Sequence, residues 1–255
     1  MTTSPSRIAL ITGANRGIGR ATAFQLARDG IDLIITYHSH QDEANAVVAE
    51  VARLGRTALA LELDTGAVDS FDAFVSTVRN RLSETWSRDT FDFLINNAGM
   101  QITASFAEAT EQGFDSLVDV HFKGVFFLTQ KLLPLLGDGG RIVNISSGLA
   151  RFSNPGSSAY ASMKGAVEVL TRYLAKELGP RGIAVNTVAP GAIATDFSGG
   201  LVRDNPEVNR RVAEMTALGR AGQPDDIGPM IAALLSDDNR WINGQRIEVS
   251  GGMAL

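Results

Sequence analysis

The feature that most constrains the fold is a regular alternation of short apolar runs with longer stretches of helical spacing. The apolar runs predict strands, and the stretches between them predict helices that cover a sheet. The runs are continuously apolar, which is typical of parallel strands buried on both faces. Strands are expected at residues 8–12, 31–37, 57–63, 91–96, 141–146, 183–188 and 245–249, and helices at 17–28, 42–54, 68–86, 111–136, 158–178 and 224–235. The fold class is therefore α/β, with a mostly parallel sheet and helices on both faces.

The length of the chain suits one α/β domain. Its 255 residues contain no linker, low-complexity segment or internal repeat, so residues 1–255 are expected to form a single domain. An apolar fraction of 44% and a charged fraction of 20% are those of an ordinary globular protein, whose core is large enough to need no covalent cross-links. The least regular stretch, 191–222, is rich in glycine and is expected to be a substrate loop or lid.

Composition also excludes several kinds of site and partner. The chain has no cysteine, so disulfides, zinc–thiolate sites, iron–sulfur clusters and cysteine nucleophiles are ruled out. His38, His40 and His121 show no metal-ligand spacing, so no metal is expected. A net charge of −5 argues against nucleic acid as a partner. No apolar run reaches the length of a membrane span, and residues 1–7 carry no signal-peptide core, so a cytoplasmic protein without a membrane partner is expected.

A glycine-rich turn follows the first predicted strand. Gly13, Gly17 and Gly19 lie between this strand and the first predicted helix, which is the context in which such a motif binds a dinucleotide phosphate. Gly13 allows the tight turn, while Gly17 and Gly19 let the backbone approach a phosphate and let the helix pack on the sheet. The helix N-terminus then offers free N–H groups and the positive end of its dipole. The alternative is an ordinary turn between a strand and a helix.

The end of the second strand bears on which dinucleotide is bound. An acid there would bind the ribose 2′-hydroxyl of NAD, whereas a basic group would accept the 2′-phosphate of NADP. The strand ends at His38 and Ser39, which could donate hydrogen bonds to a phosphate, and no acid is present. Arg16 lies in the glycine-rich turn beside the ribose site, although its alternative role is that of a solvated cation. Asp42 and Glu43 favour NAD but are expected to begin the next helix, so NADP(H) is expected and NAD(H) is the alternative.

Three residues in the second half of the chain have the chemistry of proton transfer. Tyr160 and Lys164 are four residues apart on a predicted helix, so they share one face. A tyrosine has an ordinary pKa of about 10, and a nearby ammonium is expected to lower that pKa. Ser147 follows the fifth predicted strand, at the sheet edge where ligands bind, and its hydroxyl could orient a substrate oxygen. Tyr160 is therefore a candidate acid–base for a carbonyl or alcohol oxygen; a surface Tyr–Lys contact and a serine N-cap are the alternatives.

Several motifs occur in a fixed order along the chain: Thr12-Gly13-x-x-x-Gly17-x-Gly19, Asn96-Asn97-Ala98-Gly99, Ser147, Tyr160-x-x-x-Lys164 and Pro190-Gly191. In this order they resemble the short-chain dehydrogenase/reductases, and the match runs from residue 8 to residue 252. The resemblance implies a single doubly wound Rossmann-type domain with a seven-stranded sheet. It also implies hydride transfer between a nicotinamide ring and a carbonyl or alcohol carbon.

The resemblance extends the expected cofactor site beyond the glycine-rich turn. Residues 97–99 would support the cofactor, residues 64 and 65 would contact the adenine, and residues 193 and 195 would lie beside the nicotinamide carboxamide. Lys164 would also hold the nicotinamide ribose. The expected cofactor-binding residues are thus Gly13, Asn15, Arg16, Gly17, Ile18, Gly19, His38, Ser39, Asp64, Thr65, Asn97, Ala98, Gly99, Tyr160, Lys164, Pro190, Gly191, Ile193 and Thr195.

Two residues depart from the pattern of the family. In the helix after the fourth strand the family usually has an asparagine, which anchors a water linked to the lysine, and this chain has His121 there. An imidazole can also donate, accept and relay protons, so His121 is expected to join the catalytic group; a buried structural histidine is the alternative. Met163 stands where the family often has serine. It should face away from Tyr160 and affect packing only.

The substrate pocket is expected between the catalytic residues and the loop 191–222. It would include Leu149, Arg151 and Phe152, under a mobile apolar lid formed by Phe197, Leu201 and Met215 with glycine hinges at 199 and 200. Arg151 could meet an acidic substrate or be a cation at the rim. The resemblance further implies a homotetramer, built through the helices 111–136 and 158–178 and the tail 241–255. Burial of those helices against the chain's own sheet is the alternative.

These observations leave three functional hypotheses. The first is an NADP(H)-dependent enzyme that reduces a ketone or oxidises a secondary alcohol, with ketoacyl-thioester reduction as a variant. The second is a non-catalytic NADP-binding regulator, which the intact Ser147, Tyr160 and Lys164 argue against. The third keeps the fold but changes the chemistry, as in an epimerase or a dehalogenase, and would require an altered catalytic group. The sequence therefore favours an oxidoreductase with a small-molecule carbonyl or alcohol substrate, and it does not select among ketoacyl thioesters, steroids, sugars, polyols and other ketones.

Overall fold

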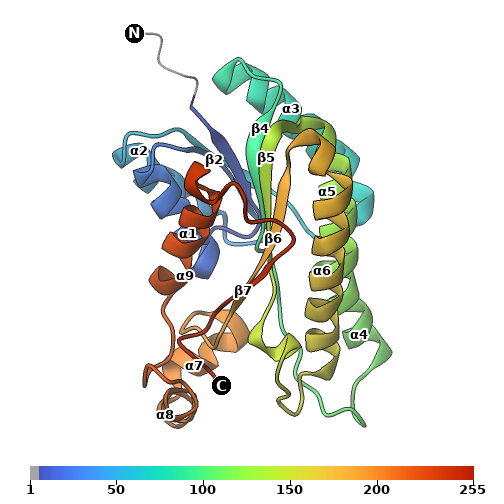
Figure 1. Cartoon of the computed structure of the whole chain (residues 1–255), viewed down its shortest axis with the longest axis vertical. Helices are drawn as coiled ribbons and strands as arrows, with labels where there is room; N and C mark the ends of the chain where they lie inside the picture. Colours follow the sequence, from blue (N-terminus) through green and yellow to red (C-terminus); the bar gives the residue numbers. More distant parts are fainter. Residues whose placement is uncertain (1–5) are drawn as a thin grey trace.

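A seven-stranded sheet forms the centre of the molecule in the computed structural model, which describes residues 6–255 (Figure 1). All neighbouring strands are parallel, in the order β3-β2-β1-β4-β5-β6-β7. Their bounds are β1 Ile8–Ile11, β2 Asp32–Tyr37, β3 Ala58–Glu62, β4 Phe91–Asn96, β5 Leu136–Ile145, β6 Ala184–Pro190 and β7 Arg246–Val249. The order changes direction between β1 and β4, which confirms the doubly wound fold and places its crevice there. Residues 1–5, on which the expectation about a leader segment partly rests, lie outside the described residues.

Helices cover both faces of this sheet, as expected. Figure 1 shows α1, α2 and α9 on one face, with α3, α5 and α6 on the other. Each face has its own buried apolar cluster, and consecutive residues of β1 alternate between them: Ala9 and Ile11 join one, and Ile8 and Leu10 join the other. This alternation explains why the strand runs are continuously apolar. The helices are α1 Gly17–Arg28, α2 Gln41–Arg53, α3 Phe71–Trp86, α4 Glu111–Val118, α5 Gly124–Leu132, α6 Ser158–Glu177, α7 Leu201–Asp204, α8 Pro206–Glu214 and α9 Pro224–Leu235.

The continuous helix expected at 111–136 is wrong in two respects. A π-helical turn at Asp119–Lys123 separates α4 from α5 and carries His121. The helix then ends at Leu132, because Pro134 lacks a backbone N–H and disrupts the helical hydrogen bonds, and β5 begins already at Leu136. The stretch 191–222 also contains helices that periodicity did not indicate, namely α7 and α8. Within residues 6–255, no helix combines the length and apolar character needed to cross a membrane.

Candidate active site

The residues singled out by the sequence gather at the carboxyl edge of the sheet. The glycine-rich turn leaves β1, residues 97–99 leave β4, Ser147 leaves β5, and Pro190 ends β6. Parallel strands bring these ends to one side of the molecule, which is where ligands bind in open α/β sheets. Thr195, which follows β6, lies close to Gly17 across this edge, since a Cβ built on Gly17 would be 3.6 Å from its Cγ2.

The glycine-rich turn has no room for a side chain at Gly13 or Gly19. Gly13 has a φ of +63°, and a Cβ there would lie 2.9 Å from the Cα of Ala98. A Cβ on Gly19 would lie 2.5 Å from the Nδ2 of Asn97 and 2.7 Å from the carbonyl oxygen of Gly13. The next helix, α1, begins at Gly17 without a side-chain cap, so its first N–H groups remain available to a ligand. Ile18 is half-buried in this first turn and packs against the core.

Asn97 and Thr12 lock this turn to the end of β4. The Asn97 Nδ2 donates to the carbonyl oxygens of Thr12 at 2.8 Å and Gly13 at 2.9 Å. In return, the Thr12 Oγ1 accepts from the backbone N–H groups of Asn97 and Ala98, both at 3.0 Å. Asn97 thus braces the glycine-rich turn through two of its backbone carbonyl oxygens. The sequence analysis did not assign a role to Thr12, although it begins the glycine motif.

The region expected to hold the adenosine ribose has both acids and bases. The Nε2 of His38 lies 3.7 Å from the Oδ2 of Asp64, and both side chains are exposed. Arg16 is exposed and makes no ion pair with any residue that the structure describes. Glu43, one of the two acids that weighed against NADP, accepts a hydrogen bond from the Asn15 Nδ2 at 2.8 Å. The acid nearest the turn is therefore already engaged.

Other predicted residues of this region make local contacts. Ser39 Oγ lies 2.8 Å from the Nδ1 of His40, which occupies the left-handed region at the start of α2. The carbonyl oxygen of Thr65 packs so closely on α5 that Gly124 is required opposite it. Ile193 pairs with Gly222 in an isolated bridge, and the N–H of Gly191 donates to the carbonyl oxygen of Val249 at 3.2 Å.

Tyr160, Lys164 and Ser147 meet in the interior. Tyr160 and Lys164 lie on successive turns of α6 and are only 7% and 5% exposed. The Lys164 Nζ lies 5.5 Å from the centre of the Tyr160 ring and donates to the carbonyl oxygen of Ile145 at 2.7 Å. The Ser147 Oγ accepts from the N–H of Leu149 at 3.2 Å, and the Ser147 side chain lies close enough to the Tyr160 hydroxyl to lower its pKa. A surface Tyr–Lys contact is thereby excluded, whereas Ser147 caps a short turn and also reaches the tyrosine.

The expected electrostatic effect of Lys164 on Tyr160 is wrong for the free protein. Burial raises the pKa of Tyr160 well above its ordinary range, and only the hydrogen bond from Ser147 acts in the opposite direction. Burial likewise lowers the pKa of Lys164 from 10.5 to about 7. Both groups lose their hydration and neither has a buried counter-ion, so each favours its neutral form. At neutral pH the phenol is fully protonated and the amine is partly neutral.

His121 is the most buried member of this group. It is 1% exposed, and its ring meets the Tyr160 ring edge-on with the centres 5.1 Å apart. Its Nε2 lies 2.6 Å from the carbonyl oxygen of Met100, while its Nδ1 is buried without a partner. Burial first, and then the charge of Lys164, lower the pKa of His121 to about 3, so the imidazole is neutral. Gly99 must be glycine here, since a Cβ would lie 2.8 Å from the His121 Cε1.

The segment expected to be a lid lies over Tyr160. The Phe197 ring centre is 6.0 Å from that of Tyr160. Phe197, Leu201 and Met215 are all more than a third exposed, and Gly199 and Gly200 have φ values of +68° and +78°. Apolar side chains therefore stand on glycine-rich backbone at the mouth of the site.

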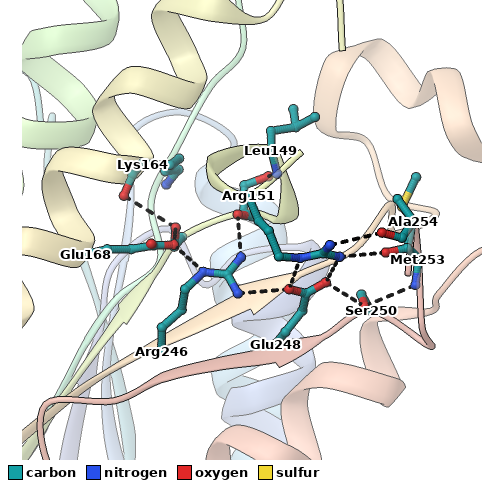
Figure 2. Close-up of polar contacts among 11 residues, drawn as sticks. Leu149, Arg151, Lys164, Glu168, Arg246, Glu248, Ser250, Met253 and Ala254 are labelled. Carbon is teal, nitrogen blue, oxygen red and sulfur yellow. Dashed lines mark hydrogen bonds and ion pairs between the residues drawn. The ribbon is translucent and has the colours of Figure 1, made fainter. Parts of the chain in front are cut away.

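Arg151 is paired with an acid of the chain itself, Glu248. Its Nε and Nη2 donate to the two carboxylate oxygens of Glu248 at 2.8 and 2.7 Å, and its guanidinium also bonds the carbonyl oxygens of Met253 and Ala254 (Figure 2). An acidic substrate would have to displace this pairing, so the structure favours the rim position. Glu248 is distant in sequence from Arg151, and no sequence pattern indicated the contact.

Met163 is half-buried on α6.

Known proteins resemble this chain over nearly its whole length. Residues 13–254 match the family model described as enoyl-(acyl carrier protein) reductase. The 3-oxoacyl-[acyl-carrier-protein] reductase FabG of Staphylococcus aureus is 36% identical over 252 residues, covering 98% of this chain and 99% of the relative. The promiscuous reductase LugOII, which catalyses keto-reduction at C1 during lugdunomycin biosynthesis, is 37% identical with a TM-score of 0.93, covering 99% of this chain and 100% of its own.

A further solved structure shows one such relative with a nucleotide. The angucycline C-6 ketoreductase LanV with bound NADP is 35% identical with a TM-score of 0.92, covering 97% of this chain and 95% of its own. The family match, the parallel sheet in this strand order and the buried Tyr160–Lys164 pair agree with one another. The chain belongs to the short-chain dehydrogenase/reductase family and is an oxidoreductase.

Proposed function

We propose that this chain reduces a ketone, or oxidises the matching secondary alcohol, with NADP(H) as cofactor and Tyr160 as the acid–base. The observation that carries the proposal is a buried Tyr160 beside Ser147, one helical turn from Lys164, at the sheet edge that also bears the glycine-rich turn. A surface tyrosine would need none of this burial. A regulator that only binds a nucleotide would need no proton donor at all.

The described residues fit a dinucleotide. A Cβ on Gly13 or Gly19 would lie too close to neighbouring atoms, so the turn carries no side chain at these positions. The first N–H groups of α1 have no side-chain cap and are available to a phosphate. Arg16 and His38 are exposed cations or donors beside the ribose region, while Glu43 is held by Asn15. This arrangement favours a 2′-phosphate over a 2′-hydroxyl, and the related LanV structure contains NADP. NAD(H) is the alternative.

When bound, the nicotinamide supplies or accepts the hydride. In reduction, Tyr160 donates its phenolic proton to the carbonyl oxygen, and its raised pKa keeps that proton in place until the oxygen becomes basic. Ser147 orients the substrate oxygen through its hydroxyl. Lys164, with a pKa of about 7, can lose and regain a proton at Nζ near neutral pH and so help to reload Tyr160. His121 is neutral and contributes hydrogen bonds rather than charge.

The expectations about the lid, the domain organisation, the location and the assembly are parts of the same proposal. Residues 191–222 form the substrate lid, and the whole chain works as one domain. The protein is cytoplasmic and assembles as a homotetramer. Exposed apolar residues on the helices that would form the interface support the assembly: Phe126 on α5 and Val169 and Tyr173 on α6 are 39%, 45% and 64% exposed. Light scattering after size exclusion tests it, and a monomer at micromolar concentration would refute it.

Turnover of a substrate panel tests the main proposal. NADPH oxidation is measured with ketones, diketones and ketoacyl thioesters, because the named relatives include ketoreductases and a 3-oxoacyl reductase. We expect turnover with at least one carbonyl class and a loss of about a thousandfold in kcat for Tyr160→Phe, with a far smaller change in NADPH affinity. Tighter binding of NADH than NADPH would overturn the choice of cofactor. NADPH binding without turnover of any carbonyl would favour the regulator.

A further inference from the structure

Arg246, in β7, contacts two parts of the candidate active site. One is the loop after β5 that begins with Ser147, and the other is helix α6, which carries Tyr160 and Lys164. The Arg246 Nε donates to the Oε1 of Glu168 on α6 at 2.7 Å, and its Nη2 donates to the backbone carbonyl oxygen of Ser147 at 3.3 Å (Figure 2). Its Nη1 donates to the Oε2 of Glu248 at 2.9 Å. One planar guanidinium thus joins three separate parts of the chain, with only 23% of the side chain exposed.

Glu168 extends this contact toward Lys164. It follows Lys164 by one turn of α6, and its side chain is 13% exposed. Besides Arg246, its Oε1 accepts a hydrogen bond from the Oγ of Ser146 at 2.7 Å, and the same Oγ lies 3.4 Å from the backbone carbonyl oxygen of Lys164. Glu168 therefore couples the helix that carries Lys164 to the residue that immediately precedes Ser147.

Glu248 anchors the outer end of the network. It accepts from Arg246, from the Nε and Nη2 of Arg151, and from the Ser250 Oγ at 3.0 Å. Hydrogen bonds from Arg151 above all lower the pKa of Glu248 to about 2, so this carboxylate stays ionised at any working pH. Arg151 also holds the carbonyl oxygens of Met253 and Ala254. The C-terminal segment 246–254 is thereby fixed against the loop that follows Ser147.

Apart from Arg246 and Tyr160, the contacts of Ser147 itself lie within its own loop. Ser147 is extended, with φ −158° and ψ 152°, and it leaves the sheet ladder at this point. Within its loop, the carbonyl oxygen of Ser147 accepts from the N–H of Ala150 at 3.1 Å. The external donor that holds that carbonyl is Arg246. Loss of the guanidinium would therefore free the serine to move relative to Tyr160, and a shift of less than 1 Å matters for proton transfer, since ~1 Å of misplacement can cost about a hundredfold in rate.

We propose that Arg246 is a positioning residue for the reaction: by joining Glu168 to the backbone of Ser147, it holds the serine hydroxyl against Tyr160. The inference rests on the proposed reductase function. It makes the last strand, remote in sequence from the catalytic residues, a part of the active-site support. Arg246 does not touch the substrate and acts only through Ser147 and Glu168.

Arg246→Met tests the proposal, because it removes the guanidinium but keeps the apolar stem. Arg181→Met is the matched control: Arg181 also bonds a carboxylate, Asp138 at 2.7 Å, and a backbone carbonyl, Leu133 at 3.1 Å, but lies at the other end of β5. We expect kcat to fall about tenfold for Arg246→Met, with the KM for NADPH within about twofold of wild type. Arg246→Lys, which keeps the charge but not the fork, should restore part of the activity.

The pH profile of alcohol oxidation separates positioning from mere stabilisation. The hydrogen bond from Ser147 acts to lower the pKa of Tyr160. A displaced serine should therefore move the apparent pKa of kcat upward in Arg246→Met, whereas Arg181→Met should leave it in place. Equal kcat values and equal pH profiles in the two variants would overturn the proposal.

Amide hydrogen exchange keeps the inference testable apart from catalysis. Faster exchange at Leu149, whose N–H donates to the Ser147 Oγ, is expected in Arg246→Met and not in Arg181→Met. If the wild-type protein turns over no carbonyl, the proposed function fails, while the exchange result still decides whether Arg246 holds the loop. If Arg246→Met does not fold, Glu168→Gln takes its place with the same expected changes, and an unchanged loop there would refute the proposal.

Discussion

The two halves of the active site are built from different materials. The glycine-rich turn is a backbone structure, in which Gly13 and Gly19 leave no space for a Cβ and no charged side chain is buried. The Tyr160–Lys164 half is a side-chain structure, in which ionisable groups lie in the interior with strongly shifted pKa values. The first half depends on the absence of side-chain volume, and the second depends on the charge states of buried groups. An added side chain should therefore weaken cofactor binding by the first half, whereas removal of a buried charge from the second half should stabilise the folded protein.

The largest expected effect concerns Lys164, whose burial destabilises the folded protein. The pKa of Lys164 falls from 10.5 in the unfolded chain to about 7 in the folded one. Lys164→Met should raise the free energy of unfolding by roughly 2–3 kcal/mol at pH 6, after allowance for the lost hydrogen bond to Ile145. The same variant should lose most of its activity. Urea denaturation and NADPH oxidation measure the two effects.

The sign of the pH dependence follows from proton binding. Between pH 7 and 10.5 the folded protein binds fewer protons at Lys164 than the unfolded chain does, so wild-type stability rises across this window. The cost of burying the amine is complete below about pH 7 and fades toward pH 10.5. The gain in Lys164→Met should accordingly be larger at pH 6 than at pH 10. Lys176→Met, on the exposed side of the same helix, should give no such gain. A Lys164→Met protein less stable than wild type at pH 6 would contradict this account of the side-chain half.

The sequence predicted the backbone half better than the side-chain half. The strands were found because residues such as Ile8 to Ile11 are buried on both faces, and burial of that kind is visible as an unbroken apolar run. The glycine-rich turn was found because glycine itself marks the places where space is absent. The π-helical turn around His121 was missed, since it changes the hydrogen bonding of the helix and leaves its periodicity almost intact.

The errors in the side-chain half arise from long-range contacts and burial. Arg151 was considered for an acidic substrate, but its partner Glu248 comes from the opposite end of the chain. The link between Arg246 and Glu168 is equally remote in sequence. The pKa of Tyr160 was expected to fall because a lysine is near, yet desolvation dominates, and spacing along a helix does not reveal it. Residue identities thus indicated the chemistry, and only the packed structure indicates its energetics.

A smaller effect is expected from added volume in the backbone half. Gly19→Ala places a Cβ 2.5 Å from Asn97 Nδ2 and 2.7 Å from the carbonyl oxygen of Gly13. Asn97 must then release the turn that it braces, and NADPH affinity should weaken about tenfold. Fluorescence titration measures the dissociation constant. The pH profile of kcat should stay that of wild type, because Tyr160 and Lys164 are untouched.

Gly165→Ala provides the control for this change. Gly165 lies on α6 next to Lys164, and a Cβ there would meet nothing within 4 Å. Replacement of a helical glycine with room around it should stabilise the protein by about 0.5–1 kcal/mol and leave NADPH affinity unchanged. Similar NADPH affinities for Gly19→Ala and Gly165→Ala would mean that space does not limit the backbone half.

The smallest expected effect is the change in kcat on replacing His121, which lies between the two halves of the site. With a pKa of about 3 the imidazole is neutral; its Nε2 lies 2.6 Å from the carbonyl oxygen of Met100, to which the Nε2–H tautomer donates, and its Nδ1 has no partner among the described residues. Asparagine also carries a donor and an acceptor, so His121→Asn should keep kcat within about threefold of wild type. Leucine offers neither and would leave Met100 unpaired, so His121→Leu should lower kcat about tenfold.

The comparison of the two variants is decisive because asparagine and leucine share the same branching and number of side-chain heavy atoms, while only asparagine forms hydrogen bonds. A role in proton transfer predicts a reduced solvent isotope effect or a new rate-limiting step in His121→Leu alone. A purely structural role predicts lower thermal stability in His121→Leu with kcat unchanged once folded protein is counted. Neither variant should remove an inflection near pH 6.5, since the wild-type imidazole does not titrate there. Equal kcat in His121→Asn and His121→Leu would exclude the histidine from the mechanism and leave Tyr160, Ser147 and Lys164 to carry the proton alone.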